Sequence, residues 1–412
     1  MKIHLDLDCF FVSAHRTEDK TLLNKPAVVV KRNDKEIFQN RKSKYYTMNK
    51  GAFTGDLIVG DEKYDKSYFL ENGKVRGIVI TASYEARELG IKTGTTLSDA
   101  LKIYPQLTVL TPHYKLYHLL SYKLKLFLKK RIPLIEQYSI DEFFGDLEGW
   151  IEDTDVFGFI EGLKREIKEK FNLPVSIGAA KSKWTAKLAT SFAKSDGIKV
   201  ILDTDKFIKD IPVGKFPGIG RQIEKKLLEK GILTLGDVKR EKEYFYSLGK
   251  NGILLYNRIC GIDNEDVVEN NKRKSIGISR RFDPVYDRGE IIRRIGVLCR
   301  YLSFLVKKKK VNPTFYYLSI KYKHFKKSKA HIVQNRIFSE FLLKETMKTL
   351  FYRADIHRDY IISLGISVSK FKKVSNLFDL QEDIKMEKLN DAVYKLRSRY
   401  GLSALVSASE II

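Results

Sequence analysis

Residues 138–147 read YSIDEFFGDL, and two adjacent carboxylates, Asp141 and Glu142, lie in the middle of this stretch. Apolar and aromatic residues on both sides predict a strand, a bend and a second strand of a buried hairpin. Burying ionised carboxylates without partners costs several kcal/mol, so the pattern predicts a cation at the bend. Taken alone, adjacent acids are more typical of a solvated turn.

The N-terminus supplies a second acidic strand. Residues 1–11 read MKIHLDLDCFF, in which Asp6 and Asp8 stand among large apolar residues. The period of a strand places these two acids on one face and Leu5 and Leu7 on the other. If this strand pairs with the hairpin, three carboxylates converge, and oxygen-only ligands suit Mg²⁺ and not zinc.

Length and charge predict a multidomain protein that binds a polyanion. The chain has 412 residues and a formal net charge of +25. Excess lysine and arginine attract nucleic acid, although a ribosome-associated or merely basic protein has the same signature. The 3 cysteines have no paired spacing, which favours a cytoplasmic location and argues against structural zinc. Because no apolar run approaches ~18 residues, we expect no membrane segment.

Two further stretches carry groups suited to phosphates. Residues 81–90 predict a strand end and a short helix on which Tyr84 and Arg87 share a face. A surface ion pair of Arg87 with a neighbouring glutamate is the alternative interpretation. Residues 216–220 read FPGIG before a basic helix at 221–230, which is typical of a helix-hairpin-helix whose glycines let the backbone approach a phosphate. Pro-Gly turns are nevertheless common in other settings.

The remaining elements follow from hydrophobic periodicity. We expect helices at 114–130, 157–171, 181–197, 289–306 and 387–400, and late strands at 276–279, 314–322, 335–339 and 361–368. The late strands and two helices would form a small α+β unit. Residues 32–76 are rich in Lys, Tyr, Asn and Gly, which favours a basic surface loop over a contact surface.

Six segments, in this order, resemble the Y-family of DNA polymerases, the translesion class. They are LDLDCFF (5–11), TASYEARELGIKTG (81–94), YSIDEFFGDL (138–147), SIGAAKSKWTAKLATSFAKSDGIKV (176–200), FPGIG (216–220) and RKSIG (273–277). The resemblance implies an α+β multidomain fold, a right-hand polymerase with a ferredoxin-like palm, small fingers, a helix-hairpin-helix thumb and an α+β little finger. The implied domains are the palm (1–11 and 112–203), fingers (12–111, with an insertion at about 32–76), thumb (204–269), linker (270–275), little finger (276–372) and tail (373–412).

The resemblance also implies roles for individual residues. Asp6, Asp141 and Glu142 would be catalytic and, with the Leu7 carbonyl, would hold two Mg²⁺ ions, for which Mn²⁺ can substitute. Asp8 shares the strand face, but the family uses the first Asp as the ligand. The implied nucleotide contacts are Cys9, Phe10, Phe11, Tyr84, Arg87 and Lys194, with Phe11 as the steric gate against a 2′-hydroxyl. The implied DNA contacts are Gly218, Gly220, Lys272, Arg273, Lys274, Arg280 and Arg281.

The expected partners are primer-template DNA and dNTPs, and we expect a monomer. The replication sliding clamp is a further candidate, because NLFDL (376–380) weakly resembles a clamp-binding peptide. This segment lacks the leading Gln, so an apolar pair in a linker is an equally good interpretation. The expected activity is low-fidelity, template-directed DNA synthesis that copies damaged DNA.

Two other classes of function share part of the pattern. A nucleotidyl cyclase would need the same acidic palm and metals, but it has no use for a helix-hairpin-helix or a charge of +25. A non-catalytic DNA-binding accessory protein would keep the basic regions, but it has no reason to retain Asp6, Asp141 and Glu142 together.

Overall fold

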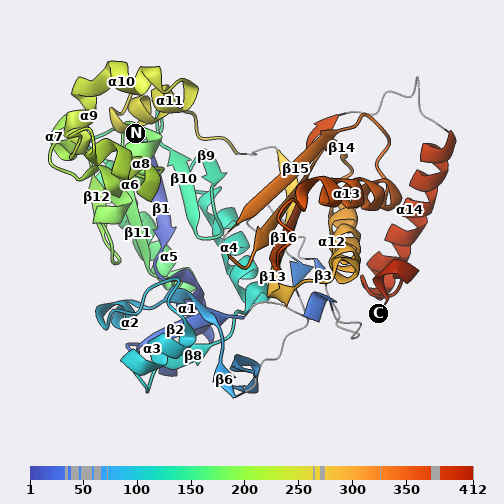
Figure 1. Cartoon of the computed structure of the whole chain (residues 1–412). Coiled ribbons are helices and arrows are strands. Elements are labelled where there is room, and N and C mark those ends of the chain that lie inside the picture. Colours follow the sequence, from blue (N-terminus) through green and yellow to red (C-terminus); the bar gives the residue numbers. More distant parts are fainter. Residues whose placement is uncertain are drawn as a thin grey trace. The chain divides into compact units, whose positions relative to one another are not determined.

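The computed structural model describes residues 1–32, 36–38, 46–47, 58–59, 66–71, 73–262, 265–269, 274–324, 326–372 and 381–411. The chain divides into two compact units (Figure 1). The first contains Met1–Lys31 and the described residues of 75–271, and the second contains the described residues of 32–49, 56–74 and 272–412. Lys272, Arg273 and the segment 376–380 lie outside the described residues. No helix in the described ranges is long and apolar enough to cross a membrane.

A five-stranded sheet forms the centre of the first unit. Its order is β12-β11-β1-β10-β9, from β1 (Lys2–Leu7), β9 (Leu134–Gln137), β10 (Glu142–Asp146), β11 (Val175–Ala180) and β12 (Ile198–Val200). β1 is central and antiparallel to both β10 and β11. A hairpin is present and pairs with the N-terminal strand as expected, but its first strand is β9 and residues 138–141 form the bend, so the first strand predicted within 138–147 was misplaced.

The two faces of this sheet are covered by different helices. On one face Ile3, Leu5 and Leu7 pack in a core with α4 (Tyr114–Leu128) and α5 (Val156–Phe171). The other face carries the alternate residues of β1 and packs against α6 (Lys183–Phe192). α6 lies close because Gly178 has no side chain: a Cβ there would come within 2.3 Å of the Ala186 carbonyl oxygen.

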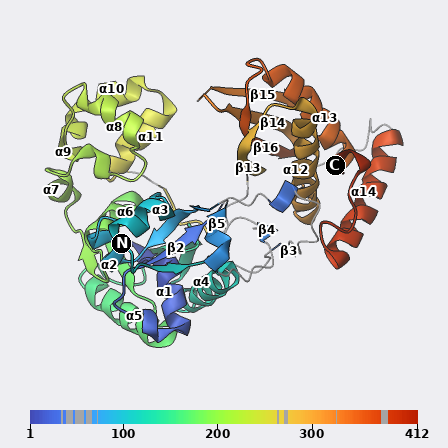
Figure 2. The ribbon, with the colours of Figure 1, turned by 60° about the horizontal axis from the view of Figure 1, so that its bottom comes forward.

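A three-stranded sheet of order β7-β2-β8 forms a smaller layer of the first unit (Figure 2). Its strands are β2 (Ala27–Lys31), β7 (Ile78–Ala82) and β8 (Thr108–Leu110), with helices α1 (Phe10–Glu18), α2 (Tyr84–Glu88) and α3 (Leu97–Ile103). Ser83 caps α2, because its hydroxyl accepts a hydrogen bond from the backbone N–H of Ala86. The short helix predicted from residues 81–90 is confirmed.

Five short helices follow in the first unit. They are α7 (Thr204–Ile208), α8 (Arg221–Leu228), α9 (Leu235–Val238), α10 (Lys242–Ser247) and α11 (Lys250–Ile259), and Figure 2 shows them gathered together. Gly218 has a φ of 102°, a conformation that favours glycine, and Gly220 is the N-cap of α8. A helix after the FPGIG turn is therefore confirmed, although it ends before residue 230.

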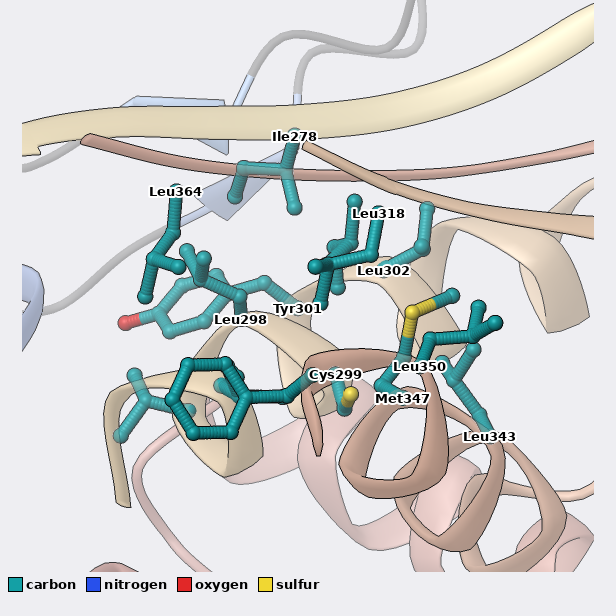
Figure 3. Close-up of a cluster of buried hydrophobic side chains, with 14 of the residues drawn as sticks. Ile278, Leu298, Cys299, Tyr301, Leu302, Leu318, Leu343, Met347, Leu350 and Leu364 are labelled. Carbon is teal, nitrogen blue, oxygen red and sulfur yellow. The ribbon is translucent and has the colours of Figure 1, made fainter. Parts of the chain in front are cut away.

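The second unit is an α+β fold with a four-stranded antiparallel sheet of order β13-β16-β14-β15. Its elements are β13 (Ser275–Val285), α12 (Arg288–Lys308), β14 (Asn312–Tyr322), β15 (Lys327–Val333), α13 (Glu340–Ala354), β16 (Ile361–Lys372) and α14 (Gln381–Tyr400). Figure 3 shows Leu302 of α12 and Met347 of α13 in the core with Ile278 and Leu364 of the sheet. Four strands and two helices were expected here.

Two predicted boundaries in this unit were wrong. The third strand is β15, not residues 335–339, because 327–333 carry the alternation of a strand while Phe338 enters the core from a loop. Phe338 is held there by a backbone hydrogen bond to the Asn312 side chain at 2.8 Å. The last helix begins at Gln381 and not at residue 387.

The interpretation of 32–76 as a surface loop of the fingers is wrong at Ile37 and Phe38. Both are buried in the hydrophobic core of the second unit. The Phe38 ring meets Phe282 edge to face at 5.6 Å, and its carbonyl accepts a hydrogen bond from Arg293 at 3.0 Å. Ile37 and Phe38, two apolar residues of a polar segment, therefore pack in a core whose other residues lie far away in the sequence.

Candidate active site

Three carboxylates meet at one end of β1 and β10. Asp6 lies directly opposite Glu142 in the antiparallel ladder, so their side chains share a face of the sheet. The Leu7 N–H donates to the Asp141 carbonyl at 2.9 Å, which fixes the bend beside the end of β1. The pairing of the N-terminal acidic strand with the acidic hairpin is confirmed, and it brings Asp6, Asp141 and Glu142 to the same end of the sheet.

The electrostatics of this cluster favour a positive partner. Burial, together with the charges of Glu142 and Asp141, raises the pKa of Asp6 to about 6, although Lys194 works against the rise. Burial and Glu142 also raise the pKa of Asp141, while a hydrogen bond from the Ser139 hydroxyl at 2.7 Å opposes the shift. Both shifts mean that the ionised forms are disfavoured until a cation approaches.

Two lysines from α6 and the turn after it supply positive charge. Lys194 Nζ lies 2.7 Å from a carboxylate oxygen of Asp6, and Lys187 forms an ion pair with Glu142. The charges of Asp6 and Asp8 raise the pKa of Lys194, although its burial works in the opposite direction. The helix was expected to continue to residue 197, but it ends at Phe192, so Lys194 lies in a turn.

Asp6, Asp141 and Glu142 supply the oxygen ligands that a metal such as Mg²⁺ needs. Their side chains are not gathered around a single metal position in this structure. Within the described residues, no three His, Cys, Asp or Glu side chains are grouped closely enough to hold an ion as they stand. Asp6 and Glu142 are paired with two different lysines, Lys194 and Lys187. Carboxylate oxygens with raised pKa values are nevertheless a donor set suited to Mg²⁺.

The aromatic residue at position 11 is fixed by a ring behind it. Phe11 and Tyr117 of α4 stack with centroids 4.3 Å apart and an interplanar angle of 7°. The Tyr117 hydroxyl lies 2.9 Å from His15 Nε2, which orients this buried ring. In contrast, the Phe10 side chain is buried in the core and presents no ring to a ligand.

Cys9 is the left-handed residue between β1 and α1. Its φ is 47°, and its side chain is buried. Burial raises the pKa of the thiol to about 11, so the group stays protonated at neutral pH. A nucleotide contact at this position would therefore involve a neutral, buried group.

Tyr84 and Arg87 lie together on α2. The Arg87 guanidinium is 5.1 Å from the centre of the Tyr84 ring, and its Nε donates to the Ala82 carbonyl at 3.0 Å. Glu85, a candidate partner for Arg87, instead pairs with Arg16 at 3.0 Å. The shared face predicted for Tyr84 and Arg87 is confirmed.

The sequence leaves the role of Asp8 open. In the structure the Asp8 side chain is buried. Only 1% of Asp8 is exposed. One carboxylate oxygen accepts from the Tyr84 hydroxyl at 2.8 Å, and the other accepts from the Ser176 hydroxyl at 2.7 Å and the Asp196 N–H at 2.9 Å. The partners come from sequence-distant elements, so no local pattern could have revealed them.

The predicted DNA contacts of the second unit divide between two sides of β13. Arg281 is exposed on the open face, while Arg280 alternates onto the side that carries Ile278. Lys274 is exposed just before the strand. One face of this sheet therefore presents Arg281 but not Arg280.

Comparison with known families gives two matches. Residues 5–191 match the model described as "impB/mucB/samB family", and residues 273–381 match the C-terminal domain of the same family. The chain is 30% identical to a DNA polymerase IV of Methanoculleus marisnigri over 285 residues, which is 68% of this chain and 69% of that protein. It is 26% identical to DNA polymerase IV of Bacillus anthracis over 431 residues, covering 100% of this chain and 93% of that protein.

Solved structures share the fold. A "Y-family DNA polymerase chimera Dbh-Dpo4(243-245)-Dbh" has a TM-score of 0.67 and 21% identity, covering 90% of this chain and 98% of the other. A structure titled "Insertion ternary complex of Dbh DNA polymerase" has a TM-score of 0.57 and 21% identity with the same coverage.

Proposed function

Because the chain belongs to the impB/mucB/samB family and is a Y-family DNA polymerase, we propose that it adds nucleotides to a primer at Asp6, Asp141 and Glu142. The activity is DNA-directed DNA synthesis of the translesion type, with DNA and dNTPs as partners. The observation that carries the assignment of the site is the convergence of these carboxylates from β1 and β10.

The three carboxylates and the Leu7 carbonyl would hold two Mg²⁺ ions, or Mn²⁺ in their place. When bound, such ions stabilise the charge of the leaving pyrophosphate and favour ionisation of the primer 3′-hydroxyl. The chain contributes carboxylates whose burial and crowding already disfavour an unpaired charge. Little other protein chemistry is needed, because positioning and charge neutralisation lower most of the barrier.

The incoming triphosphate would be held by Lys194, Tyr84 and Arg87. Lys194 is a cation beside Asp6, and the charges of Asp6 and Asp8 raise its pKa and keep it charged at neutral pH. Arg87 lies against the Tyr84 ring on the neighbouring α2, which brings a second cation to the same region of the unit. Two cations and a tyrosine suit a triphosphate that carries several negative charges.

Phe11 would act as the steric gate that excludes ribonucleotides. A gate must hold its ring in one place, since a mobile ring yields to a 2′-hydroxyl. The face-to-face stack with Tyr117 supplies that restraint. Tyr117 is itself fully buried in the core of the first unit.

Duplex DNA would be bound through its phosphates, independently of the base sequence. The turn at Gly218 and Gly220 precedes α8, where backbone N–H groups are free of helical partners and can bind a phosphate. A net charge of +25 gives the chain a general attraction to DNA. We assign the five-stranded sheet to a palm, the three-stranded sheet to fingers, residues 204–269 to a thumb and the four-stranded sheet to a little finger.

Primer extension tests the proposal. We expect the wild type to extend a primer with the templated dNTP in Mg²⁺, on an undamaged and on an abasic template. The variant Asp141→Ala/Glu142→Ala should bind the same primer-template and add nothing. A wild type that binds DNA but adds no nucleotide with either metal would favour an accessory protein, and extension by the double variant would place the active site elsewhere.

A further inference from the structure

The second aspartate of the N-terminal strand is as deeply buried as the hydrophobic core around it. Asp8 is 1% exposed, while the side chain of Asp6, two residues earlier, is 20% exposed. Both oxygens of Asp8 are occupied by hydrogen-bond donors from the chain. A carboxylate in this state is poorly placed to bind a metal ion, because it would first have to give up these donors.

The donors on Asp8 belong to three separate elements. Tyr84 comes from α2, Ser176 from β11, and Asp196 from the turn after α6. Lys194 of the same turn places its ammonium 3.3 Å from Asp8. A buried carboxylate is stable only when such donors stay in place, so Asp8 fixes α2 and this turn relative to β1.

The bond to Tyr84 restricts what the tyrosine can do. A phenol has one proton to donate, and Tyr84 donates it to Asp8 at 2.8 Å. The hydrogen bond therefore fixes the position of the Tyr84 side chain relative to β1. Burial and the Asp8 charge raise the pKa of Tyr84, so the proton is retained. Its ring remains free to support Arg87, whose guanidinium lies 5.1 Å from the ring centre.

We propose that Asp8 is a positioning residue for the triphosphate site. It holds Tyr84, which supports Arg87, and the turn of Lys194 in the arrangement that receives the incoming nucleotide, without holding a metal itself. The inference rests on the proposed function, and it assigns to Asp8 the task of fixing the tyrosine and the lysine that would hold the triphosphate.

A double-mutant cycle tests the inference in the full-length enzyme. Asp8→Asn keeps the shape but removes the charge, and we expect it to raise the KM for dNTP about tenfold, the effect of one hydrogen bond to a charged group. kcat and the Kd for primer-template should stay within about twofold of wild type, since in this proposal Asp8 would contact neither DNA nor metal. Tyr84→Phe should raise the same KM, and the double variant should raise it by less than the product of the two single effects, because Asp8→Asn weakens and Tyr84→Phe removes the same contact.

Ser13→Ala is the matched control. It removes a buried hydroxyl that donates to the Asp8 backbone carbonyl at 2.6 Å but leaves every donor on the Asp8 carboxylate, so the KM for dNTP should stay near wild type. Effects of Asp8→Asn and Tyr84→Phe that add independently would overturn the proposed action of Asp8 through Tyr84. Lower thermal stability of Asp8→Asn with an unchanged KM would show a purely structural role and overturn the inference.

The failure of this inference can be told apart from the failure of the proposed function. A wild type without templated synthesis overturns both, whereas an active wild type with an unchanged KM in Asp8→Asn overturns the inference alone. If Asp8→Asn does not fold, Tyr84→Phe removes a single hydroxyl from a partly buried ring, and an unchanged KM in that variant overturns the inference.

Discussion

Asp6 and Glu142 lie directly opposite one another across the β1–β10 ladder. Opposed like charges destabilise an antiparallel pair, and here both belong to a partly buried cluster with Asp141. Lys194 and Lys187 offset this repulsion from the α6 side. The arrangement lowers the stability of the fold and leaves strong negative potential at one point, which is the property a site for metal-assisted phosphoryl transfer requires.

Removing one charge from the cluster should stabilise the protein and abolish its activity. In Asp141→Asn the Ser139 hydroxyl can still donate to the amide oxygen, so shape and hydrogen bond are kept. We expect the free energy of unfolding to rise by about 1 kcal/mol and kcat to fall about 100-fold or more. Denaturant unfolding and primer extension measure the two effects. Asp146→Asn on the same strand is the control and should change neither; lower stability of Asp141→Asn would contradict this account of the cluster.

Lys187 should compete with the metal for Glu142. Lys187→Met removes the cation paired with this carboxylate. The Mg²⁺ concentration that gives half-maximal activity should therefore fall about threefold, a change that matches the free energy of a partly exposed ion pair. Titration of primer extension with Mg²⁺ measures it. Lys199→Met removes an exposed lysine of β12 and should leave the Mg²⁺ dependence unchanged. A higher Mg²⁺ requirement in Lys187→Met would mean that the lysine assists metal binding.

The ring behind the gate should determine how well ribonucleotides are rejected. Tyr117→Leu removes the stack on Phe11, and we expect discrimination, the ratio of kcat/KM for dNTP to that for rNTP, to fall about tenfold. Tyr117→Phe keeps the ring and loses only the contact with His15, so its discrimination should match the wild type. Equal discrimination in the leucine variant would show that Phe11 needs no support from Tyr117.

Phe38 should contribute to the stability of the second unit although its neighbours in sequence are polar. Phe38→Ala removes a buried ring that contacts Phe282. We therefore expect the free energy of unfolding to fall by about 3 kcal/mol. Amide exchange in β13 should become faster in this variant. Leu70→Ala, which changes a side chain that is 54% exposed, is the control and should have little effect. Unchanged exchange in Phe38→Ala would place the residue outside the core.

The sequence was most informative where the chemistry is local. The alternation of residues 1–11 and 138–147 was enough to predict two acidic strands, and burying Asp141 and Glu142 without a cation is costly wherever they lie. The helix after Gly220 was predicted from the FPGIG turn, and the short helix at Tyr84 was predicted from residues 81–90.

Contacts between distant segments could not be predicted in the same way. Asp8 meets Tyr84 across 76 positions and Ser176 across 168, so its burial depends on the tertiary fold and not on its neighbours. Phe38 likewise enters a core that is formed far away in the sequence. The third strand of the second unit was predicted at 335–339 because the apolar Phe338 lies there, but Phe338 packs in the core from a loop.

The central claim is that β1 and β10 form one metal-binding catalytic site. The most direct test counts bound Mn²⁺ by electron paramagnetic resonance, with a dNTP and a primer-template that lacks the 3′-hydroxyl. The account predicts about two ions per wild-type chain, the number used by two-metal phosphoryl-transfer sites, and the loss of at least one in Asp6→Asn. Equal Mn²⁺ binding by the two proteins would contradict it.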